Sequence, residues 1–138
     1  GFVDDNISQQ QIGFNFAGRN FAGSDLSYWD FAGADLSGSY LSEADLTCAN
    51  FSFADISWTV LAGAVLRSSN FSGANLNNSD LRWAHISNSS FSGANLRGAV
   101  FSGAVFINNN FSNAIADNET VWPPNFDPIA AGIGLLSG

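Results

Sequence analysis

The stretch FSGANLRGAVFSGAVF, residues 91–106, places a large apolar residue at every fifth position: Phe91, Leu96, Phe101 and Phe106. The residues between these anchors are almost all Ser, Gly, Ala and Asn. The same spacing runs without a gap from Phe16 to Phe111, where the twenty anchor positions hold nine Phe, nine Leu and two Ile. This regularity indicates an internal repeat, and the repeat has to be interpreted before any other feature of the sequence.

A period of five fits neither an α-helix nor a straight strand. Every fifth residue of an α-helix is displaced by about 140° around the axis, so the anchors would form no buried stripe. In a straight strand an odd spacing alternates between the two faces, which would expose half of the anchors. All anchors can point inward only if the chain turns a corner in every repeat. The sequence therefore predicts an all-β solenoid, in which short extended pieces wind around a central axis.

The number of sides follows from the aromatic anchors. Four repeats per coil stack residues that are twenty apart, and this register collects a column of anchors that are all aromatic: Phe31, Phe51, Phe71, Phe91 and Phe111. Three repeats per coil would stack Phe31 with Leu46 and Leu61, which gives no comparable column. We therefore predict about five four-sided coils with the all-Phe column in the core. Each buried anchor contributes roughly 1.5–3 kcal/mol to folding.

The corner residues have their own chemistry. Gly stands two residues after the anchor in nine of the twenty repeats, and Gly supplies the positive φ that a type II turn requires at its third position. We expect type II turns at corners that carry Gly or Asn. Bulky residues resist positive φ, so type I-like turns are expected at five corners: Tyr28, Glu43, Phe53, Trp58 and Trp83.

This pattern resembles the pentapeptide repeat family, in which a small residue, Asp or Asn, Leu or Phe, and two variable residues recur. The resemblance covers about residues 14–113 and implies a right-handed quadrilateral β-helix. The tail NETVWPPNFDPIAAG, residues 118–132, resembles the C-terminal cap of cyanobacterial members. Some of those members are exported, so the resemblance implies the thylakoid lumen or the periplasm after removal of a signal peptide, with the cytoplasm as the other possibility.

The two ends differ from the shaft and are predicted to be caps. The chain divides into a lead-in or N-terminal cap, a β-helix and a C-terminal cap: residues 1–13, 14–115 and 116–138. The anchor pattern stops at Ala116, after which Trp122 and Phe126 can fold over the open shaft. The two prolines after Trp122 prevent further ladder pairing. Asp127 and Pro128 can serve as N-cap and first position of a short helix.

Composition and charge exclude several functional classes. The 138 residues carry 12 Asp and Glu against four Arg, a net charge of −8, which is the wrong sign for binding a nucleic-acid backbone. No apolar run approaches the roughly 18 residues of a membrane span. The one Cys, Cys48, cannot form an internal disulfide, and the one His, His85, has only valines as column neighbours. We expect no enzyme activity, no cofactor, no metal site, no direct nucleic-acid binding and no membrane span.

Stacked carboxylates are the remaining candidates for chemistry. In the four-sided register Asp25 lies beside Asp45, and Asp35 lies beside Asp55. One carboxylate of each pair could titrate at higher pH than usual, or the pair could bind a cation loosely. A solvated acidic face is the simpler interpretation.

Exposed apolar side chains lead to the main functional hypothesis. One side of the rod is predicted to present the outward column Asn20, Tyr40, Val60, Asp80 and Val100. Trp58 and Trp83 occupy its two bounding corners. We predict that five of these residues bind a protein partner or a second copy of the chain: Tyr40, Trp58, Val60, Trp83 and Val100. The alternative is that the two Trp side chains cover Gly38 and Gly63 of the coil below and shield the backbone.

The distribution of charge supports a second hypothesis. Residues 14–60 carry one Arg and six acidic residues, whereas residues 61–115 carry three Arg and one Asp. Some pentapeptide repeat proteins mimic duplex DNA and occupy the DNA-binding groove of a topoisomerase, and such a mimic should be acidic along its length. An acidic DNA mimic acting on a gyrase-type topoisomerase is therefore the alternative function. Here the acidic stretch spans little more than two coils.

Overall fold

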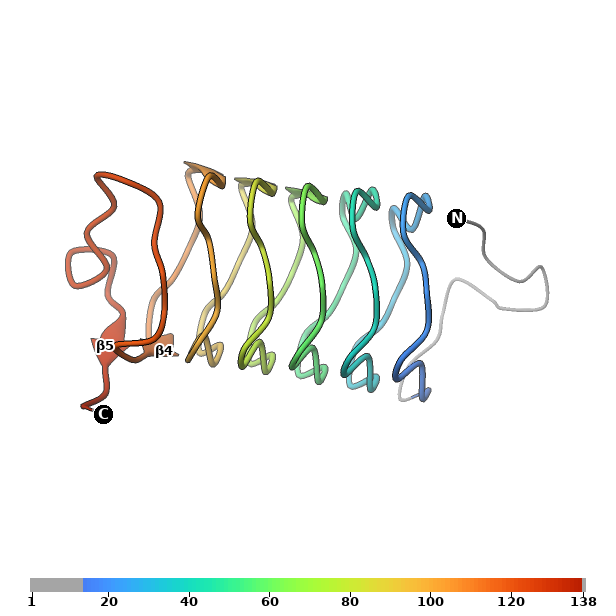
Figure 1. The fold of residues 1–138 in the computed structure, drawn as a ribbon, viewed down its shortest axis with the longest axis horizontal. Coiled ribbons are helices and arrows are strands. Elements are labelled where there is room, and N and C mark those ends of the chain that lie inside the picture. The colour runs from blue at the N-terminus through green and yellow to red at the C-terminus, as the bar shows by residue number, and fades with distance from the viewer. Residues whose placement is uncertain (1–13, 138) are drawn as a thin grey trace.

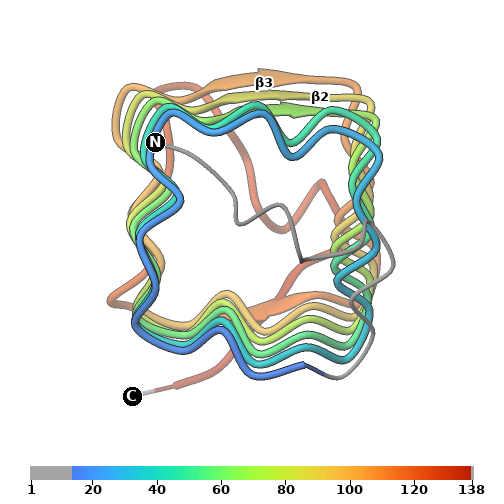
Figure 2. The ribbon, with the colours of Figure 1, turned by 90° about the vertical axis from the view of Figure 1, so that its right-hand side faces the viewer.

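The computed structural model describes residues 14–137, which form a straight rod (Figure 1) with a square cross-section (Figure 2). The rod is a right-handed quadrilateral β-helix. Each coil takes twenty residues, since Asn15 pairs in parallel with Asp35, Asp35 with Asp55, and Asp55 with Asn75. The predicted fold class and the four-sided register are therefore confirmed. The predicted lead-in, residues 1–13, lies outside the described residues.

The strands are short because every side of the square is bounded by turns. One side carries β1 (Val65–Arg67), β2 (His85–Ser87) and β3 (Val105–Ile107), which pair in parallel in that order. A second sheet pairs β4 (Ile115–Ala116) with β5 (Gly134–Leu135). Elsewhere single bridged residues connect successive coils. The ladder places His85 between Val65 and Val105, so its column neighbours are the valines expected from the sequence.

The core is a set of stacked columns inside the square. Four Phe of the predicted column are fully buried and the last, Phe111, is 3% exposed. Ring centroids of successive members lie 4.8–5.2 Å apart with nearly parallel planes. In the middle coils the small residue two positions before the anchor is also buried, as at Ala54, Ala74 and Ala94. Small and large side chains thus alternate to fill the shaft, which explains why the period of five is so strict.

The predicted turn types at the bulky corners are wrong. All five bulky corner residues have positive φ, from 56° to 66°: Tyr28, Glu43, Phe53, Trp58 and Trp83. The corner N–H of Phe53 donates to Ser72 O at 2.9 Å in the next coil, and Ala54 N–H closes the turn on Phe51 O at 3.0 Å. A different turn in one coil would break hydrogen bonds in two coils. The ladder therefore outweighs the roughly 1–2 kcal/mol that this conformation costs a non-glycine residue.

The C-terminal segment folds into the end of the shaft, as Figure 2 shows. Trp122 stacks on Phe101 with centroids 5.3 Å apart, and Phe126 packs edge-on against Phe106 at 5.0 Å. The short helix expected after Asp127 is a series of turns over residues 128–132. Asp127 Oδ1 does accept the N–H groups of residues 129 and 130, but the positive φ of Gly132 ends the turn. Within residues 14–137 no helix has the length and apolarity needed to cross a membrane.

Candidate interaction surface

The five predicted interaction residues lie on and beside one side of the rod. Tyr40 pairs with Val60, Val60 with Asp80, and Asp80 with Val100, so these residues form one row across the coils. The anchor after each row member is buried, which directs the row member itself to solvent. We call this surface the lateral face and define it by the row, its two corner tryptophans and Arg82: Tyr40, Trp58, Val60, Asp80, Arg82, Trp83, Val100 and Val121.

The aromatic side chains of the lateral face are largely accessible. Tyr40 is 50% exposed, Trp58 66% and Trp83 60%, whereas Val60 and Val100 are half-buried between them. Val121 extends the row, because it pairs with Val100 and is itself exposed. The repeat pattern does not predict Val121 as a member of this row, because Val121 lies twenty-one residues after Val100 rather than twenty. In both Val121-Trp122 and Val100-Phe101 an outward valine precedes an inward aromatic residue. This similarity is the feature of the sequence that could have predicted Val121 as a member of the row.

Of the two tryptophans, Trp83 shields a glycine, and it is not the glycine expected from the sequence. A β-carbon added to Gly103 would lie 2.5 Å from Trp83 Cδ1, so the indole covers Gly103 of the following coil. Gly38 has no such neighbour within 4 Å, and Gly63 faces the Glu43 side chain. The corner N–H points to the following coil, and the corner side chains lean the same way. Trp83 therefore shields backbone, but neither tryptophan covers the glycine that the sequence suggested.

The charge in the middle of the row is paired. Arg82 binds Asp80 through two bonds, Nη2 to Oδ2 at 2.8 Å and Nε to Oδ1 at 2.9 Å. The guanidinium carbon of Arg82 also lies 5.0 Å from the centroid of the Trp83 ring. The side-chain hydrogen bond with Arg82 lowers the pKa of the Asp80 carboxyl, so this carboxyl stays ionised. A paired charge costs less to bury under a partner than an isolated one.

The stacked carboxylates of Asp25 and Asp35 accept hydrogen bonds from their own turns. Asp25 Oδ1 accepts the hydroxyl of Ser27 at 2.6 Å and its N–H at 3.0 Å, and Asp35 does the same with Ser37. The hydroxyl and then the backbone hydrogen bond lower the pKa of both aspartates. Asp25 and Asp35 are therefore not the members of their pairs that titrate at higher pH than usual. No group of three metal-ligating side chains occurs within residues 14–137.

A family model described as pentapeptide repeats matches this chain in three overlapping segments with eight copies of the repeat: residues 30–61, 49–88 and 84–118. These segments together span more than half of the 138 residues. The chain belongs to the pentapeptide repeat family. Pentapeptide repeat proteins are generally structural or interaction modules rather than enzymes.

Several solved pentapeptide repeat proteins are similar to this one. Rfr23 from the cyanobacterium Cyanothece 51142 shares 28% identity over 83% of this chain and 91% of its own, with a TM-score of 0.49. A protein from Nostoc Pcc 7120 shares 33% identity over 78% of this chain and 84% of its own, with a TM-score of 0.45. A protein from the Arabidopsis thaliana thylakoid lumen shares 31% identity over 67% of this chain and 68% of its own, with a TM-score of 0.43. A search of curated protein sequences finds no match.

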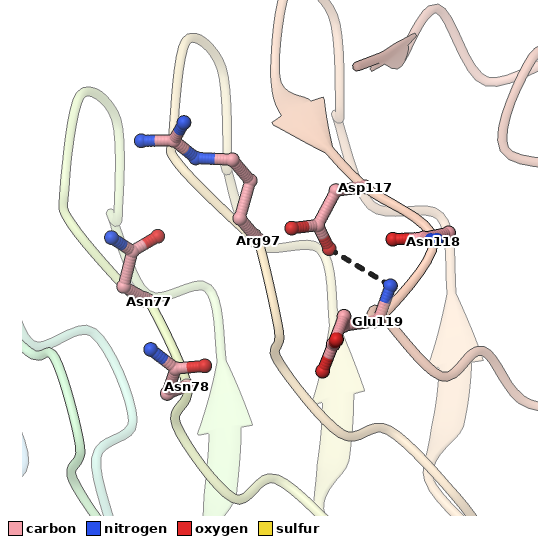
Figure 3. A pocket seen from close by; sticks show the side chains of 6 residues that line it. All are labelled: Asn77, Asn78, Arg97, Asp117, Asn118 and Glu119. Carbon is pink, nitrogen blue, oxygen red and sulfur yellow. Dashed lines mark hydrogen bonds between the residues drawn. The ribbon is translucent and has the colours of Figure 1, made fainter. Parts of the chain in front are cut away.

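A polar pocket of about 290 Å³ lies where the pentapeptide repeat ends, beyond the corner of Trp58 (Figure 3). Six residues line it: Asn77, Asn78, Arg97, Asp117, Asn118 and Glu119. Asp117 Oδ1 accepts the N–H of Gly98 at 3.1 Å and that of Glu119 at 3.0 Å. Burial raises the pKa of Asp117, but the bonds from Gly98, Glu119 and Thr120 outweigh burial and lower it. The Asp117 carboxylate thus replaces the carbonyl that a further coil would offer to Gly98.

Proposed function

We propose that this pentapeptide repeat protein is a rigid, non-enzymatic interaction module that binds a protein partner or a second copy through the lateral face. The supporting observation is the gathering of three exposed aromatic side chains, Tyr40, Trp58 and Trp83, on one side of a rod. Trp, Tyr and Arg are the residues that most often dominate binding energy at interfaces. A stacked solenoid holds them in place before binding, which reduces the entropy lost on association.

The electrostatics of the lateral face fit the same role. Asp80 is the one acidic residue of the row, and Arg82 pairs with it and lies over Trp83. A partner therefore meets an apolar row with a neutralised centre. Binding to such a surface should depend weakly on salt, because little unpaired charge is buried.

Replacing Trp58 tests the proposal. Trp58→Ser should weaken binding by about tenfold or more, the effect of losing a hot-spot side chain, while the melting temperature stays near that of the wild type. Tyr28→Ser is the matched control, because Tyr28 is an equally exposed corner aromatic (69%) that lies off the lateral face. Binding is measured by affinity capture from the native compartment, and self-association by sedimentation velocity. Equal binding by wild type and Trp58→Ser, or a monomer that captures nothing, would overturn the proposal.

An acidic DNA mimic acting on a gyrase-type topoisomerase is the second candidate. Its support is the row of ordered carboxylates in the first coils, where Ser27 and Ser37 lower the pKa values of Asp25 and Asp35. Arg67, Arg82 and Arg97 in the later coils argue against it, since they would meet a basic groove. Inhibition of gyrase supercoiling by the wild type that is lost in Asp25→Asn/Asp45→Asn would favour mimicry over the interaction module.

We also propose that the protein works in the thylakoid lumen or the periplasm. The support is its family membership and the likeness to a protein from the Arabidopsis thaliana thylakoid lumen. Protease protection of the native protein in intact thylakoids or spheroplasts distinguishes these compartments from the cytoplasm. A cytoplasmic result would leave a gyrase-type partner accessible and favour the second candidate.

A further inference from the structure

Three sides of the rod end in different ways at the C-terminal end. On the lateral face Val121 completes the ladder, since Phe101 N–H donates to Val121 O at 2.7 Å and Val121 N–H donates to Ala99 O at 3.0 Å. On another side β5 completes the ladder by pairing with β4. On the side of β3 the chain adds no further strand, and β3 is the last member of its sheet.

The missing bonds can be named by comparison with the preceding coil. There, Trp83 N–H donates to Ser102 O at 3.0 Å and Asn88 N–H donates to Ile107 O at 2.9 Å. In return, Val105 N–H donates to Ala84 O at 3.0 Å. These bonds, with the β2–β3 pairing, occupy every ladder position on this side.

In the last coil the equivalent groups have no such partner. Three donors and two acceptors make no hydrogen bond within residues 14–137: the N–H groups of Gly103, Phe106 and Asn108, and the carbonyl groups of Ala104 and Asn109. We call residues 103–109 the open edge. A row of free N–H and C=O groups is a template for a further strand.

The sequence of the cap explains why the edge stays open. Pro123 and Pro124 follow Trp122, and neither has an N–H to give to a ladder. Trp122 and Phe126 stack inside the shaft on Phe101 and Phe106. Figure 2 shows the chain turning across the square at this point instead of continuing above β3. The cap therefore covers the interior of the end but not the backbone of this side.

Val105 and Ile107 on the open edge are apolar, whereas the same two positions of the preceding coil are polar. Val105 is 41% exposed and Ile107 is 52% exposed. The register places them beside His85 and Ser87 of the preceding coil. Residues 103–109 contain no charge and no proline, the devices that usually protect a strand edge from pairing. Hydrogen-bonding groups and apolar side chains thus coincide at the end of the ladder.

We propose that the open edge binds an extended peptide segment of a partner protein, which adds to β3 as a further strand. Valine or isoleucine of that segment would pack beside Val105 and Ile107, as cross-strand neighbours do. Basic residues should flank it, because this chain has a net charge of −8. A second rod fits less well, since the cap projects beyond β3 along the rod axis (Figure 1). The open edge adjoins the lateral face at Gly103, which Trp83 covers, and it extends from there onto the side of β3.

A synthetic peptide tests the proposal directly. The probe is Lys-Lys-Val-Ile-Val-Ile-Val-Lys-Lys, N-methylated at alternate residues so that one edge of its backbone remains free. A version methylated at all five central residues has neither edge free. Alternate methylation can leave either edge free, and at least one of these two probes should bind. Full methylation should weaken binding by about tenfold or more, because the ladder bonds are lost. Binding is measured by fluorescence anisotropy.

Variants and amide exchange locate the binding site. Ile107→Lys should weaken binding of the probe, because it places a charge beside the added strand. Ser87→Lys, in the same column but one coil from the edge, is the matched control. Exchange of the Phe106 and Asn108 amides should slow when the probe binds. Trp58→Ser should leave binding unchanged, which separates this site from the lateral face.

Four results would overturn the proposal. The first is that no probe binds, and the second is that the alternately and the fully methylated probes bind equally well. The third is that Ile107→Lys and Ser87→Lys weaken binding to the same extent. The fourth is that the protein self-associates and that Ile107→Lys abolishes this self-association. The last result would assign the open edge to a second copy. Loss of binding in Trp58→Ser alone would place the peptide on the lateral face and leave the proposed function standing.

Discussion

The shaft and the C-terminal cap place aromatic residues in different surroundings. In the shaft Phe71 stacks between Phe51 and Phe91, the phenylalanines at the same position of the two neighbouring coils. Its ring centroid lies 4.8 Å from that of Phe51 and 5.0 Å from that of Phe91. In the cap Trp122 contacts Phe101 face to face and Phe111 edge-on. The shaft repeats one contact in every coil, whereas each cap contact occurs once.

Because the shaft coils have neighbours on both sides, they should be more stable than the cap. Each shaft coil is held by identical neighbours on both sides, so a defect there disturbs two interfaces. The cap has the shaft on one side and solvent on the other. Units held on one side open at lower free energy than units held on both. The cap should therefore be the first part of the described chain to open.

Truncation of the Phe column should give the largest effect. Phe71→Ala should lower the free energy of unfolding by about 3–5 kcal/mol, because rigid coils on both sides cannot collapse into the cavity. Tyr28→Ala, at an exposed corner, is the matched aromatic control. Both are measured by urea unfolding. Equal, small losses would contradict the difference between column and corner.

Truncation in the cap should cost less and act locally. Trp122→Ala should lower stability by about 2 kcal/mol, since the half-buried indole loses one stacked contact. Amide protection of Val121 should fall while that of Phe71 is retained. Ile129→Ala changes an exposed cap residue (71%) and serves as the control. A uniform loss of protection along the rod would show that cap and shaft open as one unit.

The cap should also lose stability in acid through Asp117. The folded-state pKa of Asp117 lies below its unfolded value, so its contribution is present above the unfolded pKa of about 3.9. That contribution is lost as the pH falls through the folded-state pKa. Asp117→Ala should therefore lower cap stability at neutral pH and reduce its acid dependence, as followed by amide exchange of Gly98 and Val121. Glu119→Ala is the control, and identical acid profiles for wild type and Asp117→Ala would refute this role.

The smallest effect is expected at the corners. Trp58→Gly should raise the free energy of unfolding by about 0.5 kcal/mol, because glycine adopts positive φ without strain. The corner of the following coil is Asn78, so the loss of the Trp58 indole uncovers no glycine there. Trp83→Gly should not be stabilising, since it uncovers Gly103 and removes the contact with Arg82. Calorimetric melting temperatures compare the two. A gain at both corners would mean that the Trp83 contacts contribute nothing.

The sequence was informative about the shaft and less so about the corners. The anchor period, the all-Phe column and the plug formed by Trp122 and Phe126 follow from side-chain size and spacing alone. The positive φ of Trp83 contradicts its local preference, because the preference of one residue competes with ladder bonds to the next coil. The direction in which Trp83 leans also depends on that coil. Neither property is encoded within the corner itself.

The repeat in the sequence is enough to predict which residues point inward, how many sides each coil has and where the repeat stops. The reason is that a strict period of small and large residues permits one way to bury every anchor. The tertiary structure decided which surfaces remain available. It joined Tyr40, Val60, Val100 and Val121 into one row, paired Asp80 with Arg82, and left the backbone of residues 103–109 without a neighbour. These features depend on contacts between coils and on the path of the cap across the shaft, and hydrogen bonds between residues about twenty apart are formed only when the coils stack.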